Sequence, residues 1–298
     1  MSTQSILSSK GELLAQELAD LTPLADCRGL TLYAFYADNK PVTLEEIGRL
    51  REVGFRAVGA GRGQTLDLDD LDTGPGAYQQ LIAWDAAEQE IVAMYRFQLG
   101  ARQALYGDGC LRTSRLFDYS PEFRDQGLHR AIELGRSVVN RDARRAKLGF
   151  FALWAGLGAL LRTYPEVRYF FGNVSLYKSM DPEARDCLVH HLHQHYQPAQ
   201  PWLRARPWVR FETPDLIISP AVAPGELDTP EQRIRQLRQL LSPWQESIPP
   251  ILQSYMGLST EIQFGETVFD ADFGDALEIG LVVPVEKINE QVRQRFID

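Results

Sequence analysis

The chain has 298 residues and a mass of 33.7 kDa, and 44% of its residues are hydrophobic and 24% charged. Such a composition excludes a disordered chain, a collagen-like repeat and a coiled coil, and the length allows one large domain or two smaller ones. The net charge of −9 argues against a protein that coats nucleic acid, because no overall positive field is available to neutralise phosphates.

The cysteines and the chain ends indicate a compartment. Cys27, Cys110 and Cys187 lie far apart and form no C-x-x-C pair, which predicts free thiols in a reducing environment. The polar N-terminus lacks the apolar segment of a secretory signal, and the longest apolar run, 148–161, is too short to cross a bilayer. We therefore expect a cytoplasmic protein, with peripheral contact to the inner face of the membrane left open.

The first part of the chain, residues 1–43, is predicted to be an accessory segment with a helical pattern at 11–21 and a β-type run at 31–36. Thr43-Leu-Glu-Glu46 has the spacing of a capping box, so we expect a helix to begin there and to end near residue 57. Its apolar face is assigned to Ile47, Leu50, Val53 and Phe55.

The following residues, 44–298, are predicted to form the main domain. The Gly- and Asp-rich stretch 59–76 indicates an irregular loop. Two β-type runs follow at 78–84 and 91–99, and 107–115 is expected to lead into a third strand or sheet edge.

The centre of the chain has the order strand 131–139, basic loop 140–147, helix 148–162 and strand 167–176. This order is a βαβ unit, in which the two strands lie parallel and side by side.

The C-terminal part begins with a helix at 181–196 and continues with a Pro-rich segment, 197–227, which we expect to be an irregular insertion. The remaining elements are expected to be helices at 229–241 and 247–255 and a β pair formed by 259–269 and 276–283.

The basic loop of the βαβ unit is a candidate anion site. Arg144, Arg145 and Lys147 precede a helix N-terminus, where free backbone N–H groups and the helix dipole favour a phosphate. The loop is neither a P-loop nor a dinucleotide fingerprint, since Gly156 and Gly158 fall inside the helix. The alternative interpretation is a solvated basic turn, with glycines that let the helix pack close to the sheet.

Glu133 is a candidate general base because a carboxylate on an inner strand is costly unless it is paired or used. Strand alternation places Glu133 and Ser137 on one face and Arg136 on the other. The alternative is a structural Glu–Arg pair across neighbouring strands.

These segments resemble a known family. Glu133-Leu-Gly-Arg-Ser137, Leu153-Trp-Ala-Gly-Leu-Gly158 and Arg168-Tyr-Phe-Phe-Gly-Asn-Val-Ser175 are similar to bacterial ornithine lipid-type N-acyltransferases, the "hemolysin-like" branch of the GNAT superfamily. This branch also resembles N-acyl amino acid synthases and acyl-homoserine lactone synthases. The likeness extends over about residues 44–290 and includes further pieces at Arg51 with Phe55, Asp69 with Asp72, Met94–Phe97, Phe117–Asp118, Pro249–Tyr255 and Phe269–Phe273.

The resemblance implies an α/β fold with a mixed, mostly antiparallel central sheet, flanking helices and a splayed parallel strand pair that admits the donor's pantetheine. It implies Glu133 as the base that removes a proton from the attacking amine, directly or through a water. The acceptor would be bound by Asp69, Asp72, Arg51 and Arg96; a structural salt-bridge network among these four is the alternative. The implied donor-binding residues are Arg136, Arg144, Arg145, Lys147, Leu148, Gly149, Asn173 and Ser175.

The resemblance further implies an enzyme that moves a 3-hydroxyacyl or other fatty acyl group from acyl carrier protein to the amine of an ornithine-, lysine- or glycine-like amino acid. The product would be a lipoamino acid, and the donor an acyl-phosphopantetheine thioester, on acyl carrier protein or coenzyme A, with no permanently bound cofactor. Three alternatives stand beside it: an acyl-homoserine lactone synthase, an acetyl-CoA-dependent N-acetyltransferase and a non-catalytic module that binds acyl carrier protein.

His191 and His195 are four residues apart on a predicted helix and have the spacing of zinc ligands. The segment has no H-E-x-x-H pattern and no acidic residue at the right distance, so we expect a polar helix face and no metal site.

Overall fold

The computed structural model describes residues 3–212, 229–259 and 261–297. Within these residues eight strands form a central sheet in the order β1-β2-β3-β4-β6-β7-β10-β9, and two short strands, β5 and β8, pair separately. The central strands are β1 (Ala25–Cys27), β2 (Leu30–Phe35), β3 (Gln79–Asp85), β4 (Glu90–Leu99), β6 (Ala131–Val139), β7 (Tyr169–Leu176), β9 (Gln263–Asp270) and β10 (Ala276–Pro284). The short pair is β5 (Phe117–Tyr119) with β8 (Leu203–Ala205).

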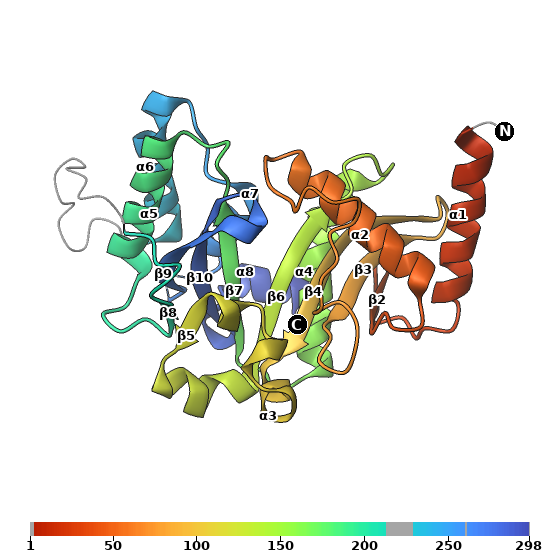
Figure 1. The fold of residues 1–298 in the computed structure, drawn as a ribbon, viewed down its shortest axis with the longest axis horizontal. Coiled ribbons are helices and arrows are strands. Elements are labelled where there is room, and N and C mark those ends of the chain that lie inside the picture. Colours follow the sequence, from red (N-terminus) through yellow and green to blue (C-terminus); the bar gives the residue numbers. More distant parts are fainter. Residues whose placement is uncertain (1–2, 213–228, 260, 298) are drawn as a thin grey trace.

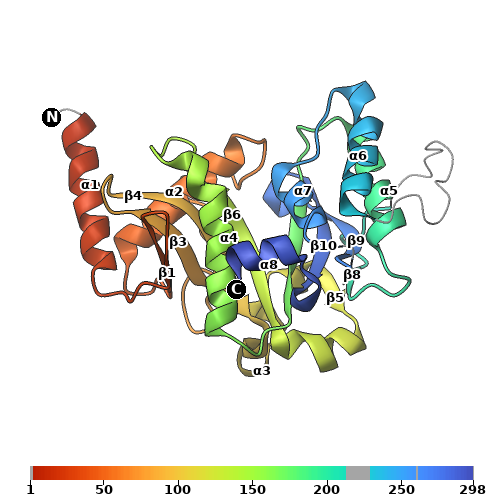
Figure 2. The ribbon, with the colours of Figure 1, turned by 180° about the vertical axis from the view of Figure 1, so that it is seen from behind.

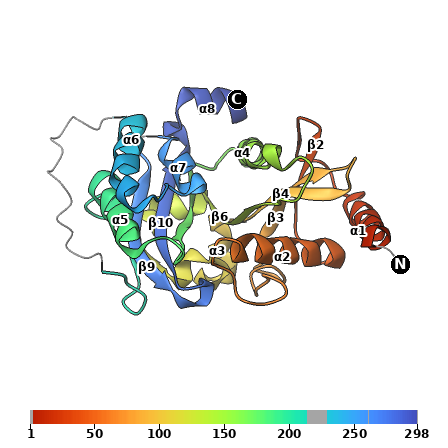
Figure 3. The same ribbon diagram turned by 90° about the horizontal axis from the view of Figure 1, so that it is seen from above.

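Helices cover both faces of the sheet. They are α1 (Thr3–Leu18), α2 (Pro41–Arg56), α3 (Gln103–Tyr106), α4 (Ala146–Thr163), α5 (Pro182–Tyr196), α6 (Pro230–Leu241), α7 (Pro250–Met256) and α8 (Glu290–Phe296). In Figure 1, α1 lies at one end of the sheet, and β9 and α5 lie at the other. Viewed from above, α2 lies on one side of the sheet and α4 and α8 on the other (Figure 3).

The predicted fold class is confirmed. Neighbouring strands are antiparallel except β6 and β7, which are parallel over the register Ala131–Tyr169 to Leu134–Gly172. Helix α4 makes the crossover between these two strands, as the βαβ pattern predicted. The segment 1–43 contributes β1 and β2 to one edge of this sheet, and α1 packs against α2.

The glycines of α4 permit close packing, the role that the alternative interpretation of the basic loop gave them. A Cβ on Gly156 would lie 2.8 Å from Leu81 Cδ2 on the sheet, and one on Gly158 would lie 1.6 Å from the carbonyl oxygen of Phe296. Residue 156 therefore faces β3 and residue 158 faces the C-terminal helix α8, which lies across α4 in Figure 2.

Two local predictions on the N-terminal side were wrong. Helix α2 begins at Pro41, two residues before the predicted cap, and its first N–H groups are capped from another helix: the backbone N–H groups of Val42 and Thr43 donate to the Glu17 carboxylate at 3.0 and 2.7 Å. Val53 is 49% exposed, whereas the other three predicted apolar positions of α2 are buried.

The segment 107–115 leads into a third strand, as expected. Short 3₁₀ turns occupy Asp108–Cys110 and Thr113–Arg115, and the strand of this region is β5. About half of the predicted insertion 197–227, from residue 213 on, lies outside the described residues; its first part holds β8.

Candidate functional site

A pocket of about 170 Å³ opens where β6 and β7 separate. Their pairing ends at Leu134 and Gly172, and a Cβ on Gly172 would lie 2.6 Å from the Leu134 carbonyl oxygen. Beyond this point each strand forms one wall of the pocket. The lining consists of Leu134–Ser137 of β6, Asn173–Ser175 of β7, Glu278 of β10, Pro249–Ile251 and Tyr255 near α7, and Phe55, Tyr78, Tyr95, Arg96, Arg112, Tyr177, Asp270 and Phe273.

A β-bulge shapes the β6 wall and corrects the predicted alternation. Arg136 has a φ of 53°, and the register of β4 with β6 shifts between Met94 and Arg96. The extra residue turns the Arg136 side chain toward Asp67, with a Nε–Oδ2 distance of 2.8 Å. Arg96 pairs with the neighbouring carboxylates Asp69 and Asp72. Arg136 therefore lies on the same face as Arg96, and not on the opposite face that strand alternation predicted.

Glu133 is 1% exposed and is held by three donors. Its Oε1 accepts the backbone N–H of Thr113 at 2.6 Å, and its Oε2 accepts the Arg112 N–H at 3.1 Å and the Tyr78 hydroxyl. It does not pair with Arg136, so the alternative of a Glu–Arg pair is wrong. Burial raises the pKa of the Glu133 carboxyl above its usual range, and the hydrogen bonds oppose that shift.

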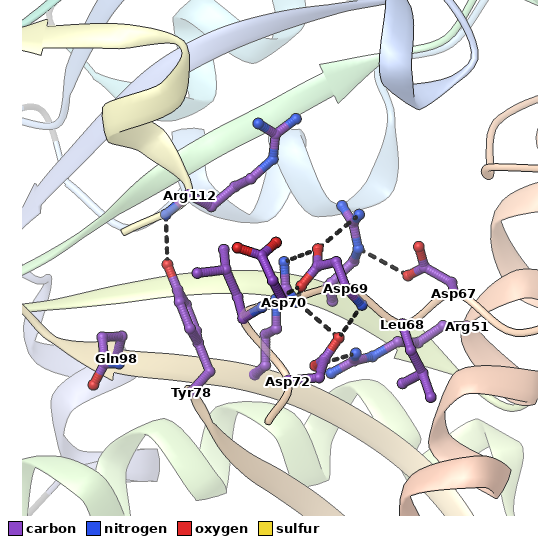
Figure 4. Close-up of polar contacts among 12 residues, drawn as sticks. Arg51, Asp67, Leu68, Asp69, Asp70, Asp72, Tyr78, Gln98 and Arg112 are labelled. Atoms are coloured by element: carbon purple, nitrogen blue, oxygen red, sulfur yellow. Dashed lines mark hydrogen bonds and ion pairs between the residues drawn. The ribbon is translucent and has the colours of Figure 1, made fainter. Parts of the chain in front are cut away.

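Tyr78 separates Glu133 from the pocket. Of these two residues, Tyr78 lines the pocket and Glu133 lies behind it. The Tyr78 hydroxyl also accepts the backbone N–H of Arg112 at 2.8 Å, which Figure 4 shows. Any proton exchange between Glu133 and a pocket ligand would therefore pass through this hydroxyl.

The four predicted acceptor-binding residues lie together, and they are ion-paired with one another. Arg51 donates to Asp72 Oδ1 at 2.8 Å, and Arg96 donates to Asp72 Oδ2 at 3.0 Å and to Asp69 Oδ1 at 2.6 Å. Arg51, Asp72 and Arg96 are at most 1% exposed, and Asp69, at 11%, is the most accessible of the four. This is the salt-bridge network that the sequence offered as the alternative, and Arg96 carries it to the wall of the pocket.

The ion pairs shift the pKa values of the residues in this network. The Arg51 and Arg96 guanidinium groups lower the pKa of Asp72 against the opposing effect of burial, and Arg96 lowers that of Asp69 in the same way. Asp72 and Asp69 in turn raise the pKa of Arg96 well above its usual range, against its burial. All three groups are therefore charged at neutral pH.

The predicted basic loop lies at the start of α4, and its arginines form hydrogen bonds with the turns that connect β1 to β2 and β3 to β4. Arg144 donates to Glu88 at 2.5 Å and is 73% exposed; Arg145 binds the carbonyl oxygens of Arg28 and Gly29. Lys147 is exposed and Leu148 half-buried, and Gly149 packs on Val139, where a Cβ would lie 2.7 Å away. These residues do not line the pocket between β6 and β7.

Asn173 and Ser175 do line the pocket, and they point to a residue that the sequence analysis missed. The Asn173 amide and the Ser175 hydroxyl both donate to the carboxylate of Glu278, the latter at 2.7 Å. Glu278 stands opposite Ser175 on β10 and is 1% exposed. The signal in the sequence was a single Glu inside the otherwise apolar run Ala276–Val283.

Arg112 and Asp270 were missed as well. The Arg112 guanidinium pairs with Asp270, and both residues border the first pocket and a second one of about 540 Å³ that continues outward. Figure 4 shows that this guanidinium points away from the acidic cluster. The charged ion pair therefore lies between the inner pocket and the outer, more open one.

The histidines form no ligand set. The rings of His191 and His195 are in contact, with centroids 4.5 Å apart and planes tilted by 52°, and burial lowers the pKa of His191 to about 3. In the described part of the chain, no group of three or more His, Cys, Asp or Glu residues could hold a metal ion. None of the helices described combines the length and hydropathy that a bilayer span requires.

Comparison with known proteins assigns the chain to a family. Residues 50–155 match the model of the acetyltransferase (GNAT) domain family. A glycine N(alpha)-acyltransferase from Bacteroides thetaiotaomicron is 35% identical over 274 residues, covering 89% of this chain and 80% of the relative. A protein of the same name from Phocaeicola vulgatus is 32% identical over 275 residues, covering 90% and 83%.

Among solved structures, the CoA-dependent acyl-homoserine lactone synthase BjaI, with SAM and isopentyl-CoA, aligns over 53% of this chain and 72% of that chain. The TM-score is 0.34 and the identity 15%. The two curated relatives, which the chain matches over most of their length, confirm the predicted family. This chain belongs to the GNAT N-acyltransferases and is a member of the family of these glycine acyltransferases.

Proposed function

We propose that the enzyme transfers a fatty acyl group, 3-hydroxylated or not, from the phosphopantetheine thioester of acyl carrier protein to the amine of an amino acid. Among ornithine-, lysine- and glycine-like acceptors, glycine is the first candidate, because both curated relatives are named for it. The product is an N-acyl amino acid.

The observation that carries this proposal is the gap between β6 and β7. Beyond Leu134 and Gly172 the two parallel strands no longer pair, and the backbones of 135–137 and 173–175 border the pocket. A pantetheine arm has amide groups of its own, so it fits between two such backbones like an additional strand. The thioester carbon then lies near the bulge at Arg136.

The chemistry requires a neutral amine and a stabilised oxyanion, since an ammonium is not a nucleophile. We propose that backbone N–H groups of β6 at the bulge stabilise the oxyanion. Glu133 is proposed to accept a proton from the amine nitrogen of the acceptor through the Tyr78 hydroxyl, to which it is hydrogen-bonded. No cysteine lines the pocket in the described residues, so the amine is proposed to attack the thioester directly.

For the acceptor, we propose that Arg96 and Arg136 present positive charge to its carboxylate. Both line the pocket, and Asp69, Asp72 and Arg51 hold Arg96 in place from behind. A free amino acid has a carboxylate at a fixed, short distance from its amine, so such a contact positions the nucleophile.

The direct test uses purified protein with acyl carrier protein charged with a 3-hydroxyacyl or a simple fatty acyl group and, separately, with acyl-CoA. Each donor is offered glycine, ornithine, lysine and a mixture of the other amino acids, and products are identified by mass spectrometry. We expect an acyl-glycine from the carrier-bound donor. Release of thiol with no acylated amine in any mixture would refute the proposal.

The predicted carrier surface can be tested separately, because Arg144 and Lys147 are exposed at the start of α4. Replacing both by Glu is expected to lower kcat/KM for acyl carrier protein more than about tenfold, since that partner is acidic and exposed charges act on encounter rate. The loss should shrink as salt increases, and acyl-pantetheine, which has no carrier surface, should lose much less. Arg145 is left unchanged because it holds the loop at Arg28 and Gly29.

A matched control reverses two exposed charges on α6, Arg235 and Arg238, and is expected to retain the wild-type rate with every donor. Equal losses for carrier and pantetheine donors at every salt concentration would contradict a carrier-binding surface at the start of α4.

A further inference from the structure

Glu278 is a buried carboxylate in the wall of the pocket that the proposed function does not use. It lies on β10, the strand that pairs with β7, beside the pocket that opens between β6 and β7, and its side chain is 1% exposed. Asn173 and Ser175, which donate hydrogen bonds to it, also line the pocket, so the three side chains form one polar patch of the pocket wall.

This carboxylate has no ion-pair partner within the described residues. Its neutral neighbours satisfy part of its hydrogen-bonding capacity, and Arg112, whose charge opposes the rise of the Glu278 pKa, is paired with Asp270. An ionised carboxylate removed from water is costly when no cation accompanies it. A cationic ligand that enters the pocket would supply the missing partner.

We propose that Glu278 binds the ammonium group of the amino-acid acceptor and takes its first proton. This inference rests on the proposed function and adds to it a carboxylate that touches the substrate. Asn173 and Ser175 are positioning residues, because their hydrogen bonds fix the Glu278 carboxylate oxygens in the pocket wall.

The proton balance gives Glu278 and Glu133 different steps. An ammonium nitrogen loses two protons on becoming an amide nitrogen. The first passes to Glu278 and later to water, which leaves a neutral amine whose electron pair forms the C–N bond. The second leaves the tetrahedral intermediate through Tyr78 and Glu133 and reaches the thiolate when the C–S bond breaks. The products are an amide, a thiol and one released proton.

The groups around Glu278 are consistent with proton transfer near neutral pH. Burial and the Asp270 carboxylate raise its pKa to about 7, while Ser175, Asn173 and Arg112 oppose the shift. Tyr177, which also faces it, has a pKa raised to about 12 and is neutral over the working range. The acceptor's ammonium can therefore meet an ionised carboxylate that is readily protonated.

The test compares Glu278→Gln with wild type on two acceptors. With glycine near neutral pH, we expect kcat/KM to fall at least about 100-fold, the scale of a lost acid–base group. The loss should diminish about tenfold per pH unit as the solution pH approaches the pKa of the glycine amine. With aminoacetonitrile, an amine that is mostly neutral at this pH, the variant should keep its rate within a few-fold.

Folding is monitored in the same preparations. Because the folded pKa of Glu278 is raised above its unfolded value, the ionised carboxylate costs stability above about pH 7, and that cost disappears as pH falls below the ordinary carboxyl range. The Gln variant is therefore expected to have a Tm at neutral pH no lower than wild type. Glu266→Gln on the neighbouring strand β9, outside the pocket, is the matched control and should retain the wild-type rate.

Two results would overturn this role while leaving the proposed function intact: an unchanged rate of Glu278→Gln with glycine, or an equal loss with both amines at every pH. A wild-type enzyme that acylates no amine would overturn the proposed function, and with it the role of Glu278.

Discussion

Replacing Asp72 by Asn is expected to lower the free energy of unfolding by about 3–5 kcal/mol, the usual cost of removing one partner from a buried ion pair. Asp72 accepts hydrogen bonds from Arg51, Arg96, Gln80 and the backbone N–H of Asp69. The Asn amide would point its own N–H donors at the N–H donors of Arg51 and Arg96. These two buried guanidinium groups would then have too little negative charge beside them. Urea unfolding followed by circular dichroism measures the change.

Asp70→Asn is the control for this experiment, two residues away and with the same chemical change. Asp70 is 69% exposed and pairs with Arg115 at 2.5 Å, so its loss is expected to cost no more than about 1 kcal/mol. Equal, small effects of the two substitutions would show that the Arg51–Asp72–Arg96 network does not stabilise the fold.

The same network predicts a pH dependence. The pKa values of Asp69 and Asp72 are lower in the folded state, so their contribution is complete above the ordinary carboxyl range and is lost as pH falls through the folded values. Stability of the wild type should therefore fall on acidification, and Asp72→Asn should show a smaller fall.

The second large effect is expected for Glu133→Gln. Activity per folded molecule should drop at least about 100-fold, and the loss should be the same for glycine and for aminoacetonitrile, since the second proton must leave either amine. The variant should also lose about 1–3 kcal/mol of stability, because its amide turns a donor toward the Tyr78 hydroxyl or the N–H groups of Arg112 and Thr113.

Tyr78→Phe separates the two roles of Glu133. It removes the hydroxyl that borders the pocket and leaves Glu133 with both backbone donors. We expect it to lose most of the activity and less stability than Glu133→Gln. A destabilised Glu133→Gln enzyme with normal activity per folded molecule would show that Glu133 only holds the turn at Arg112.

The sequence determined the βαβ centre of this protein almost to the residue. Local sequence patterns define the strand 131–139, the apolar crossover helix and the strand that follows it. Their order along the chain makes the two strands a parallel pair. The helix predicted at 229–241 also has the expected start, because the cap at Thr229 and the first turn are adjacent in sequence. The family resemblance followed from the same local segments.

Tertiary structure decided the features that depend on residues distant in the chain. Glu17 of α1 caps α2, so Thr43 did not mark the helix start that its own motif predicted. The bulge at Arg136 brings its side chain to Asp67, because a strand's alternation holds only while its pairing register is unbroken. Glu278 joins Asn173 and Ser175, 105 and 103 residues earlier in the chain, only because β10 pairs with β7. Periodicity reports which residues are buried, whereas the sheet order decides which buried charges meet.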